Sequence, residues 1–323
     1  MRENGSLTYD VVIPFHNGVK YVKFAFLSVL IQTHQPQSVI FVDDHSTDDT
    51  EETIKSLISE YDPKFPIRIL KSEKRGPSAA RNLGINASKS EFIAFLDVDD
   101  TWMSKKIENQ IKLIKNQEIL IHSASKVIDS NLLTIAEIKP QGNPTFESIL
   151  LNDYWITGGC SSVLINRKAL AAAGNFDENM YFSEDYDLWL RLSKIGKFSA
   201  CESMDVKLLK HPESATQKSL RNLQILEIKS LIYCHSKHNL LKSKNSNNVL
   251  QKYVKLHLAA RIGQPIKLSK FIMKLILDKQ IPLLSMFGNR REILKFLHQT
   301  ITQIILQKIK GRIYKITTWI IKD

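Results

Sequence analysis

The 323-residue sequence lacks most signs of a secreted, membrane-spanning or dinucleotide-binding protein. Its three cysteines, Cys160, Cys201 and Cys234, are an odd number without metal-type spacing, which argues against a disulfide framework and predicts a reducing compartment. The first ten residues contain no apolar signal core, and no apolar run reaches the roughly 18 residues that a membrane span needs. Neither G-x-G-x-x-G after the first predicted strand nor a P-loop occurs, so dinucleotide-binding enzymes are disfavoured. We expect a cytoplasmic protein.

The charge of +12 is distributed unevenly along the chain. Residues 1–217 contain 24 Lys and Arg against 29 Asp and Glu, whereas residues 218–323 contain 21 against 4. This difference predicts two parts, a catalytic domain at 1–217 and a basic region at 218–323 that faces an anionic partner.

Apolar segments of strand type alternate with segments of helical spacing through the first hundred residues. Such alternation predicts an α/β fold, with a mostly parallel sheet covered by helices on both faces. The predicted strands are 10–14, 39–42, 67–73 and 91–97, and the predicted helices are 19–32, a segment capped by Ser46 or Thr47, and 76–88.

Carboxylates gather where the fourth predicted strand ends, in FLDVDDTWM (95–103). Asp97 and Asp99 are one residue apart, so on a strand their side chains are expected to point alike. Two such carboxylates suit Mg²⁺ or Mn²⁺, which prefer oxygen ligands and usually retain water and substrate phosphates. The pattern predicts a site for a metal ion and a diphosphate. The alternative is a solvated, acidic turn before the next helix.

Further polar residues follow the other predicted strands, at the edge where such sheets bind ligands. Asp43 and Asp44 follow the second strand, and either could meet a base or ribose or only stabilise the next helix. Arg81 is a candidate partner for phosphate or carboxylate. Glu184 and Asp185 begin a later helix with Ser183 as the expected N-cap, and this pair is the best general-base candidate. His211 could contact metal or phosphate, although a lone histidine is more often structural.

Together these segments resemble the family 2 glycosyltransferases, inverting enzymes with the GT-A fold. The resemblance covers about residues 8–215 and rests on motifs in the family's order and spacing. The matching segments are VVIPFHNGVKYVKFAFLSVLIQTHQP, VIFVDDHSTDDT, GPSAARNLGINASKSEFIAFLDVDDTW and GNFDENMYFSEDYDLWLRL.

The resemblance implies a role for each matching residue. Pro14 and the residues after it would line the nucleotide site, Asp44 with Asp43 would meet the base, and Arg81 would lie near the nucleotide. Asp97 and Asp99 would form the DxD motif, with Asp99 the more direct metal ligand. Asp185, after Glu184, would be the catalytic base, and His211 would lie near the diphosphate. His45 stands where the family commonly has glycine.

The implied reaction moves a sugar from a nucleotide-sugar, with UDP the expected nucleotide, to a glycan or lipid-linked glycan, in surface polysaccharide biosynthesis. The segment 294–320 repeats isoleucine and leucine every three or four residues beside lysines, as helices on anionic membranes do. A peripheral contact with the inner face of the cell membrane is therefore expected, and an ordinary helical bundle is the alternative. Motifs of nucleic-acid-binding modules are missing from this region, so no nucleic-acid partner is expected.

Two other functions remain open from the sequence. FLDVDDT also fits the nucleophile motif of haloacid-dehalogenase-like phosphatases, although that motif usually lies on the first strand. A non-catalytic, glycosyltransferase-like binding protein is the second alternative, but all the expected carboxylates are present.

Overall fold

The computed structural model describes residues 7–115, 118–150, 156–180 and 182–214, together with Cys234 and Lys237. The chain forms two compact units, Met1–Arg221 and Asn222–Asp323. Nearly all described residues belong to the first unit, so the predicted basic helices and their membrane contact lie outside the described residues. Within the described part, no helix is long and apolar enough to cross a membrane.

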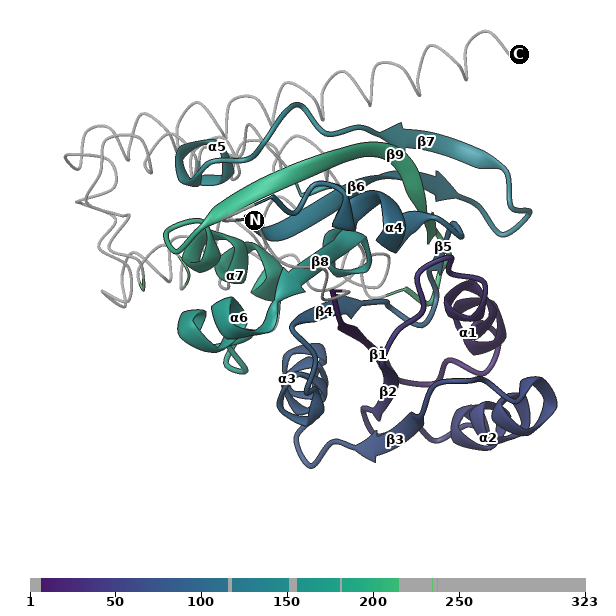
Figure 1. Ribbon diagram of the computed structural model, residues 1–323. Coiled ribbons are helices and arrows are strands. Elements are labelled where there is room, and N and C mark those ends of the chain that lie inside the picture. Colours follow the sequence, from purple (N-terminus) through teal and green to yellow (C-terminus); the bar gives the residue numbers. More distant parts are fainter. Residues whose placement is uncertain are drawn as a thin grey trace, which may run out of the picture. The chain divides into compact units, whose positions relative to one another are not determined.

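The described strands of the first unit form one nine-stranded sheet in the order β3-β2-β1-β4-β8-β6-β9-β5, with β7 paired to β6 (Figure 1). The strands are β1 Tyr9–Phe15, β2 Ser38–Asp43, β3 Ile67–Lys71, β4 Phe92–Phe95, β5 Thr101–Trp102, β6 Glu118–Ile128, β7 Thr134–Ile138, β8 Val163–Asn166 and β9 Lys197–Leu209. The helices are α1 Val22–Leu30, α2 Thr50–Tyr61, α3 Pro77–Ala87, α4 Lys106–Ile111, α5 Phe146–Leu150, α6 Arg167–Ala173 and α7 Glu184–Leu192, with a short 3-10 turn at Gly159–Ser162.

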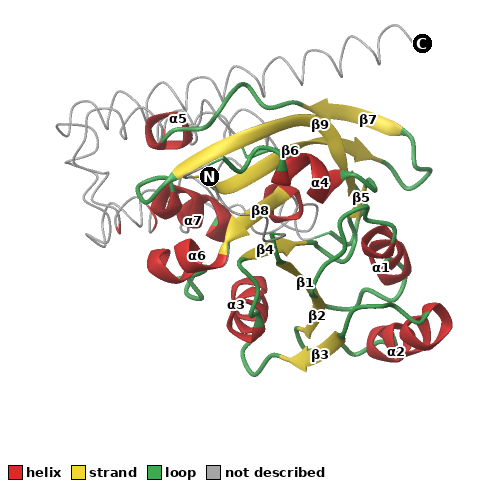
Figure 2. Cartoon of the chain, viewed as in Figure 1, coloured by secondary structure: helices red, strands yellow, loops and turns green. Residues whose placement is uncertain are grey.

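The first four strands are parallel, which confirms the predicted α/β half of the sheet. The apolar residues of β1, β2 and β4 are almost fully buried because helices cover both faces, α3 on one side and α1 and α2 on the other (Figure 2). Beyond β4 the sheet becomes mixed. β8 pairs antiparallel with β4 and β6, whereas β9 runs parallel to β6.

Three local expectations were wrong. α1 begins at Val22 rather than at 19, because the Tyr21 and Val22 amides donate to the Gly18 carbonyl in a preceding turn. Neither Ser46 nor Thr47 caps α2, because Asp43 Oδ1 and Asn17 Oδ1 accept their amides within the loop. β4 ends at Phe95, so the acidic motif lies in a turn after the strand.

Close packing joins α3 to the centre of the sheet. A Cβ added to Gly84 would lie 2.3 Å from Cγ1 of the fully buried Val12, so only glycine fits this interface. Near the start of β1, the buried Asp10 carboxylate accepts hydrogen bonds from Ser38 Oγ, Ser88 Oγ and the amides at 89 and 90. α3 is thereby fixed against β1, and the side chains that it carries are fixed with it.

Candidate active site

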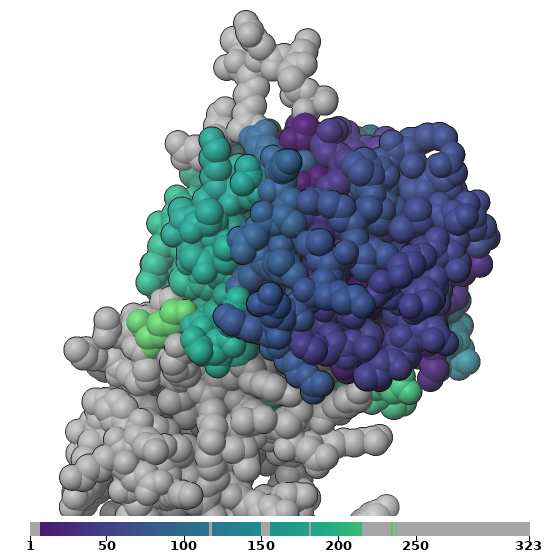
Figure 3. Space-filling view, turned by 90° about the horizontal axis from the view of Figure 1, so that it is seen from below, coloured from purple at the N-terminus to yellow at the C-terminus, as the bar shows by residue number. Residues whose placement is uncertain are grey.

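Acidic side chains lie at the carboxyl ends of β2 and β4 and at the start of α7, and His211 follows β9. Residues from these distant segments are brought together in the first unit, where purple-to-blue and teal parts of the chain share one face (Figure 3). The contacts among these side chains define the candidate site.

Arg81 on α3 links two acidic segments that are far apart in sequence. Its Nη2 donates to Asp97 Oδ1 and its Nη1 to Glu184 Oε1, each at 2.8 Å. The side chain is only 7% exposed and its guanidinium carbon lies 5.4 Å from the Phe176 ring centroid. Arg81 therefore holds the first acid of the DxD motif and the Glu-Asp pair in one arrangement.

Asp99, the second acid of the motif, is bound to the end of β9. Its Oδ2 lies 2.9 Å from His211 Nε2, and His211 Nδ1 lies 3.0 Å from the Tyr21 hydroxyl at the start of α1. Burial and repulsion by Asp97 raise the pKa of Asp99, against the hydrogen bond from His211. A carboxylate in this state has electrostatic energy to gain from a nearby cation.

Asp97 and Asp99 lie beyond β4 rather than on a strand, and their carboxylates contact different residues, Arg81 and His211. Both acids lie in a turn in which the Asp100 amide donates to the Asp97 carbonyl. Asp100 is buried and accepts from Ser161 Oγ at 2.6 Å and from the Leu209 amide at 3.2 Å. Asp100 is thus the structural acid of the three, because it holds the turn against β9 and the Gly159–Ser162 segment.

Asp185 begins α7 next to Glu184. Its Oδ1 accepts a hydrogen bond from the Tyr186 amide at 2.7 Å, and burial raises its pKa, with Arg81 acting in the opposite direction. Within the described residues Asp185 makes no ion pair. A carboxylate without a fixed counterion and with a raised pKa is suited to accept a proton.

The segment that contains Gly158 and Gly159 lies next to the Asp185 carboxylate. Gly158 and Gly159 have φ of +76° and +54°, and a Cβ on Gly159 would lie 3.8 Å from Asp185 Oδ2. Ser183 occupies the N-cap position of α7, as expected, but its side chain makes no capping hydrogen bond and its φ is +58°. The backbone near the Asp185 carboxylate is therefore in the left-handed region at both glycines and at Ser183, and a residue other than glycine adopts this conformation only at some cost.

Asp43 is the last residue of β2 and Asp44 follows it, and the two acids have separate partners. Asp43 is buried and accepts the Ser46 amide at 2.7 Å, which shapes the loop. Both Asp44 oxygens accept the Gly76 amide, at 2.9 and 3.0 Å, at the N-terminus of α3. His45 has a φ of +61°, so it adopts the conformation that glycine would take there. Pro14 lies in β1, paired with Val42, and is buried.

Sequence reasoning did not identify Ser161, Tyr21 and Phe176 as neighbours of the acidic motif. Ser161 accepts the Asp97 amide at 3.0 Å and donates to Asp100, so it supports the turn from both sides. Its place directly after Gly-Gly-Cys was the signal that the sequence offered. Nothing in the local sequence marks Tyr21 or Phe176.

The donor set fits a divalent ion that also binds phosphate. Among the described residues, no group of three or more His, Cys, Asp and Glu is placed to hold a metal ion alone. Mg²⁺ and Mn²⁺ usually take one or two protein carboxylates and complete their shell with substrate phosphates and water. Asp97 and Asp99, 34% and 25% exposed, remain accessible for that role.

Comparisons with known proteins identify the family of this chain. The model of the family described as glycosyl transferase family 2 matches residues 10–171. An uncharacterized glycosyltransferase of Rickettsia felis is 30% identical over 216 residues, which are 65% of this chain and only 35% of that protein. The Escherichia coli protein named UDP-Glc:alpha-D-GlcNAc-diphosphoundecaprenol beta-1,3-glucosyltransferase WfgD is 29% identical over 200 residues, 59% of this chain and 72% of its own length.

Solved structures share the fold at low identity. S. aureus TarS in complex with UDP-GlcNAc has a TM-score of 0.60 at 17% identity and covers 78% of this chain and 73% of its own. GalNAc-T7 with UDP, GalNAc and Mn²⁺ has a TM-score of 0.58 at 16% identity, with coverage of 84% and 55%.

Proposed function

This chain belongs to glycosyl transferase family 2, and from that premise we propose that it moves a sugar from a nucleoside-diphosphate sugar to a hydroxyl of a lipid-linked or free glycan, with inversion. UDP is the expected nucleotide, in line with the nucleotides named for WfgD and for the TarS complex. The diphosphoundecaprenol named for WfgD supports a lipid-linked acceptor and a role in surface polysaccharide assembly.

The donor would bind at the edge where β1, β2 and β4 end. Asp44, fixed by the Gly76 amide, would accept a hydrogen bond from the base, near Pro14 and Asp43. Asp97 and Asp99 would hold Mg²⁺ or Mn²⁺, in line with the Mn²⁺ named for the GalNAc-T7 structure. Such an ion, when bound, neutralises charge on the leaving diphosphate. His211 would orient the Asp99 carboxylate through the contact between His211 Nε2 and Asp99 Oδ2.

Asp185 would act as the general base. A carboxylate within hydrogen-bond reach of the acceptor hydroxyl takes its proton while the oxygen attacks the anomeric carbon. Glu184, the preceding residue, is held by Arg81, so the start of α7 keeps a fixed position relative to Asp97. Positioning of the two substrates contributes most of the catalysis in such a displacement.

The observation that carries this proposal is the Arg81 bridge between the DxD motif and the Glu-Asp pair. It joins the expected metal-binding segment to Glu184, the residue before the expected base, at hydrogen-bond distance. An ordinary acidic helix start or an isolated acidic turn would not require a buried arginine between them.

A panel of sugar nucleotides with Mg²⁺ or Mn²⁺, assayed by nucleoside diphosphate release in the presence of glycan acceptors, tests the proposal. Asp185→Asn should lose most of the transfer and retain donor binding, whereas Glu202→Gln, at an exposed position of β9, should behave as wild type. Equal transfer by Asp185→Asn and wild type would contradict the assignment of the base and support a non-catalytic binding role.

The phosphatase alternative is tested in the same preparation. Hydrolysis of p-nitrophenyl phosphate that depends on Asp97, without sugar transfer, would support that alternative. The ion pair of Asp97 with Arg81 disfavours a phosphorylated nucleophile at this position, because Arg81 already binds one of the two carboxylate oxygens.

The basic region 218–323 would bring the enzyme to an anionic membrane surface. Its 21 Lys and Arg against 4 Asp and Glu support this proposal, since basic segments are attracted to anionic lipids. The region lies almost entirely outside the described residues, so the charge count is the observation behind it.

A further inference from the structure

The turn between β6 and β7 exposes an unusual amount of apolar surface. Leu132 and Leu133 are 69% and 63% exposed, and Ile135 at the start of β7 is 49% exposed. We call these three residues the apolar tip. Scattered single apolar residues are common on protein surfaces, but three within four positions of one turn form a patch.

The turn is built to hold the leucines outward. Asp129 Oδ1 accepts the amides of Asn131 and Leu133, both at 2.9 Å, and the Asp129 amide donates to the Leu133 carbonyl. Leu132 has a φ of +64°, a left-handed conformation that is rare for a bulky side chain. A glycine or asparagine would adopt this conformation more easily. The sequence therefore keeps a leucine where both exposure and backbone geometry disfavour it.

Lysines lie on and next to the strands that lead away from the apolar tip. Lys126 pairs across the strands with Lys207, and Lys126 and Lys139 share the carboxylate of Glu137, at 3.6 and 3.8 Å. Lys210 is exposed and follows β9, where its amide donates to the Ile128 carbonyl. We call Lys126, Lys139, Lys207 and Lys210 the lysine collar.

We infer that the apolar tip and the lysine collar form a membrane-contacting element on the catalytic unit, with anionic lipid as the partner. Apolar side chains beside lysines suit the boundary between headgroups and acyl chains. The collar disfavours a second copy of the chain on the β7 edge, because two such edges would place lysines against lysines. The same charges attract an anionic surface.

The strand register places this element at the same end of the sheet as the candidate active site. Ile128 pairs with Leu209, and His211, two residues further, contacts Asp99. A membrane bound at the tip would therefore lie close to the rim that Asp99 and His211 occupy. The benefit of this placement for an acceptor on a lipid carrier rests on the proposed function, whereas lipid binding itself does not.

Partition of the full chain into vesicles tests the inference without any substrate. The double variant Leu132→Ser/Leu133→Ser should partition about tenfold less into vesicles of phosphatidylcholine and phosphatidylglycerol, because two leucines no longer enter the bilayer. The loss should persist at about 1 M salt, where the electrostatic contribution of basic segments is screened. Circular dichroism should show unchanged folding, because the replaced side chains are exposed.

Ile195→Ser is the matched control. Ile195 is 46% exposed and lies just before β9, whose first residue pairs with Glu118 at the opposite end of the sheet. This variant should partition as wild type does. Equal partition of the double variant and wild type would overturn the inference. So would an unchanged partition with a loss of self-association in sedimentation velocity, which would assign the tip to a second copy. Failure of sugar transfer with intact vesicle binding would refute only the proposed function.

Discussion

Replacement of Arg81 by methionine tests the bridge at the centre of the candidate site. The variant keeps a long side chain but leaves Asp97 and Glu184 without their shared cation. Removing one partner of a buried ion pair costs about 3–5 kcal/mol. Asp97 is one third exposed, so water relieves part of its penalty, whereas Glu184 is only 14% exposed. We therefore expect the lower end, about 3 kcal/mol, for the unfolding free energy.

For a unit of this size, that loss corresponds to a fall in melting temperature of roughly 6–12 °C. Differential scanning calorimetry measures it, and Arg75→Met is the matched control because Arg75 is exposed and makes no ion pair within the described part of the chain. At 37 °C, Arg81→Met should lose sugar transfer because part of the protein is unfolded. At 15 °C the variant is folded, and transfer should still be low because Asp97 and Glu184 are no longer held by Arg81.

The pH dependence adds a second measurement on the same variant. Burial raises the pKa of Glu184, and Arg81 opposes this rise. Without Arg81 the folded state binds more protons than the unfolded state as the pH falls towards 5, so acidification should recover part of the lost stability. A variant as stable as Arg75→Met at pH 7, with full transfer activity, would refute the role assigned to the bridge.

Other consequences of the packing can be measured separately. Burial lowers the pKa of Lys106 to about 7, so above that pH the unfolded chain binds one proton more than the folded chain. The free energy of unfolding should therefore rise with pH by up to about 1.4 kcal/mol per pH unit. Urea titrations at pH 7 and 8.5 measure this rise, which Lys106→Met should remove. Gly84→Ala overpacks α3 against Val12 and should cost about 1–3 kcal/mol, seen as a lower urea midpoint. Tyr21→Phe removes the hydroxyl from His211 and should weaken Mn²⁺ binding with UDP about tenfold, measured by electron paramagnetic resonance.

Each of these has a contrary outcome. A pH slope shared by wild type and Lys106→Met would show that this amine is not the group responsible. An unchanged midpoint for Gly84→Ala would mean that α3 moves away from β1 without cost. Equal Mn²⁺ affinity in Tyr21→Phe and wild type would separate the tyrosine from the metal site.

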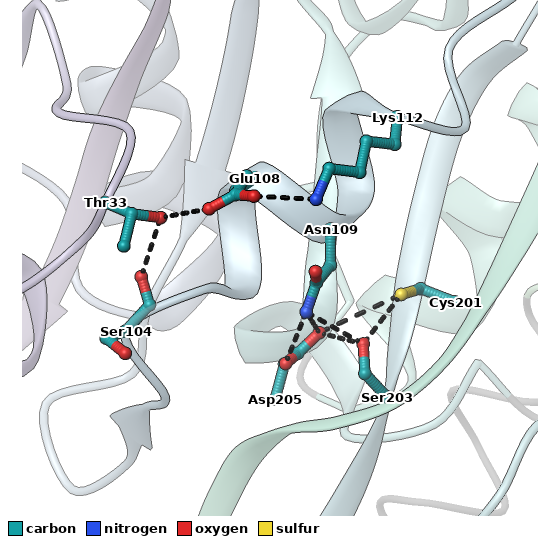
Figure 4. Close-up of polar contacts among 8 residues, drawn as sticks. All are labelled: Thr33, Ser104, Glu108, Asn109, Lys112, Cys201, Ser203 and Asp205. Carbon is teal, nitrogen blue, oxygen red and sulfur yellow. Dashed lines mark hydrogen bonds and ion pairs between the residues drawn. The ribbon is translucent and has the colours of Figure 1, made fainter.

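The buried environment of Lys106 illustrates a polar interior that composition does not reveal. Its Nζ lies 3.0 Å from Gln110 Oε1 and 4.1 Å from the Trp102 ring centroid. Nearby, Asn109 donates to Ser203 and to both oxygens of Asp205, which joins α4 to β9 (Figure 4). Sequence patterns treat such residues as surface, and only tertiary partners place them inside.

The same reason explains why the parallel half of the fold could be predicted, whereas in the second half α7 could be predicted and β6 could not. β1, β2 and β4 are apolar runs between clear helices, so pattern and topology agree. β6 contains His122, Ser123 and Ser125, which are buried, and these polar residues interrupt the apolar run by which β1, β2 and β4 are recognised. His122 is accommodated by Thr157, 35 residues away, a contact that no local pattern contains.

The candidate site, too, could be predicted only in part. The acids at the strand ends could be named from the sequence, because parallel strands end at one edge. The pairs that these residues form could not be predicted, since Arg81 and Glu184 are 103 residues apart and Asp99 and His211 are 112 apart. The strand ends at Phe95, two residues earlier than the pattern indicated, so strand alternation does not determine the orientation of Asp97 and Asp99.

The position of β9 has a consequence for biosynthesis. It is the last strand of the described chain to leave the ribosome, yet it lies between β6 and β5 rather than at an edge. The parallel strands β1 to β4 can associate while translation continues, but the sheet cannot close until residue 209 has emerged, and long-range pairing of this kind is slow. A nascent polypeptide therefore has no His211 beside Asp99, and the centre is assembled only near completion of this unit.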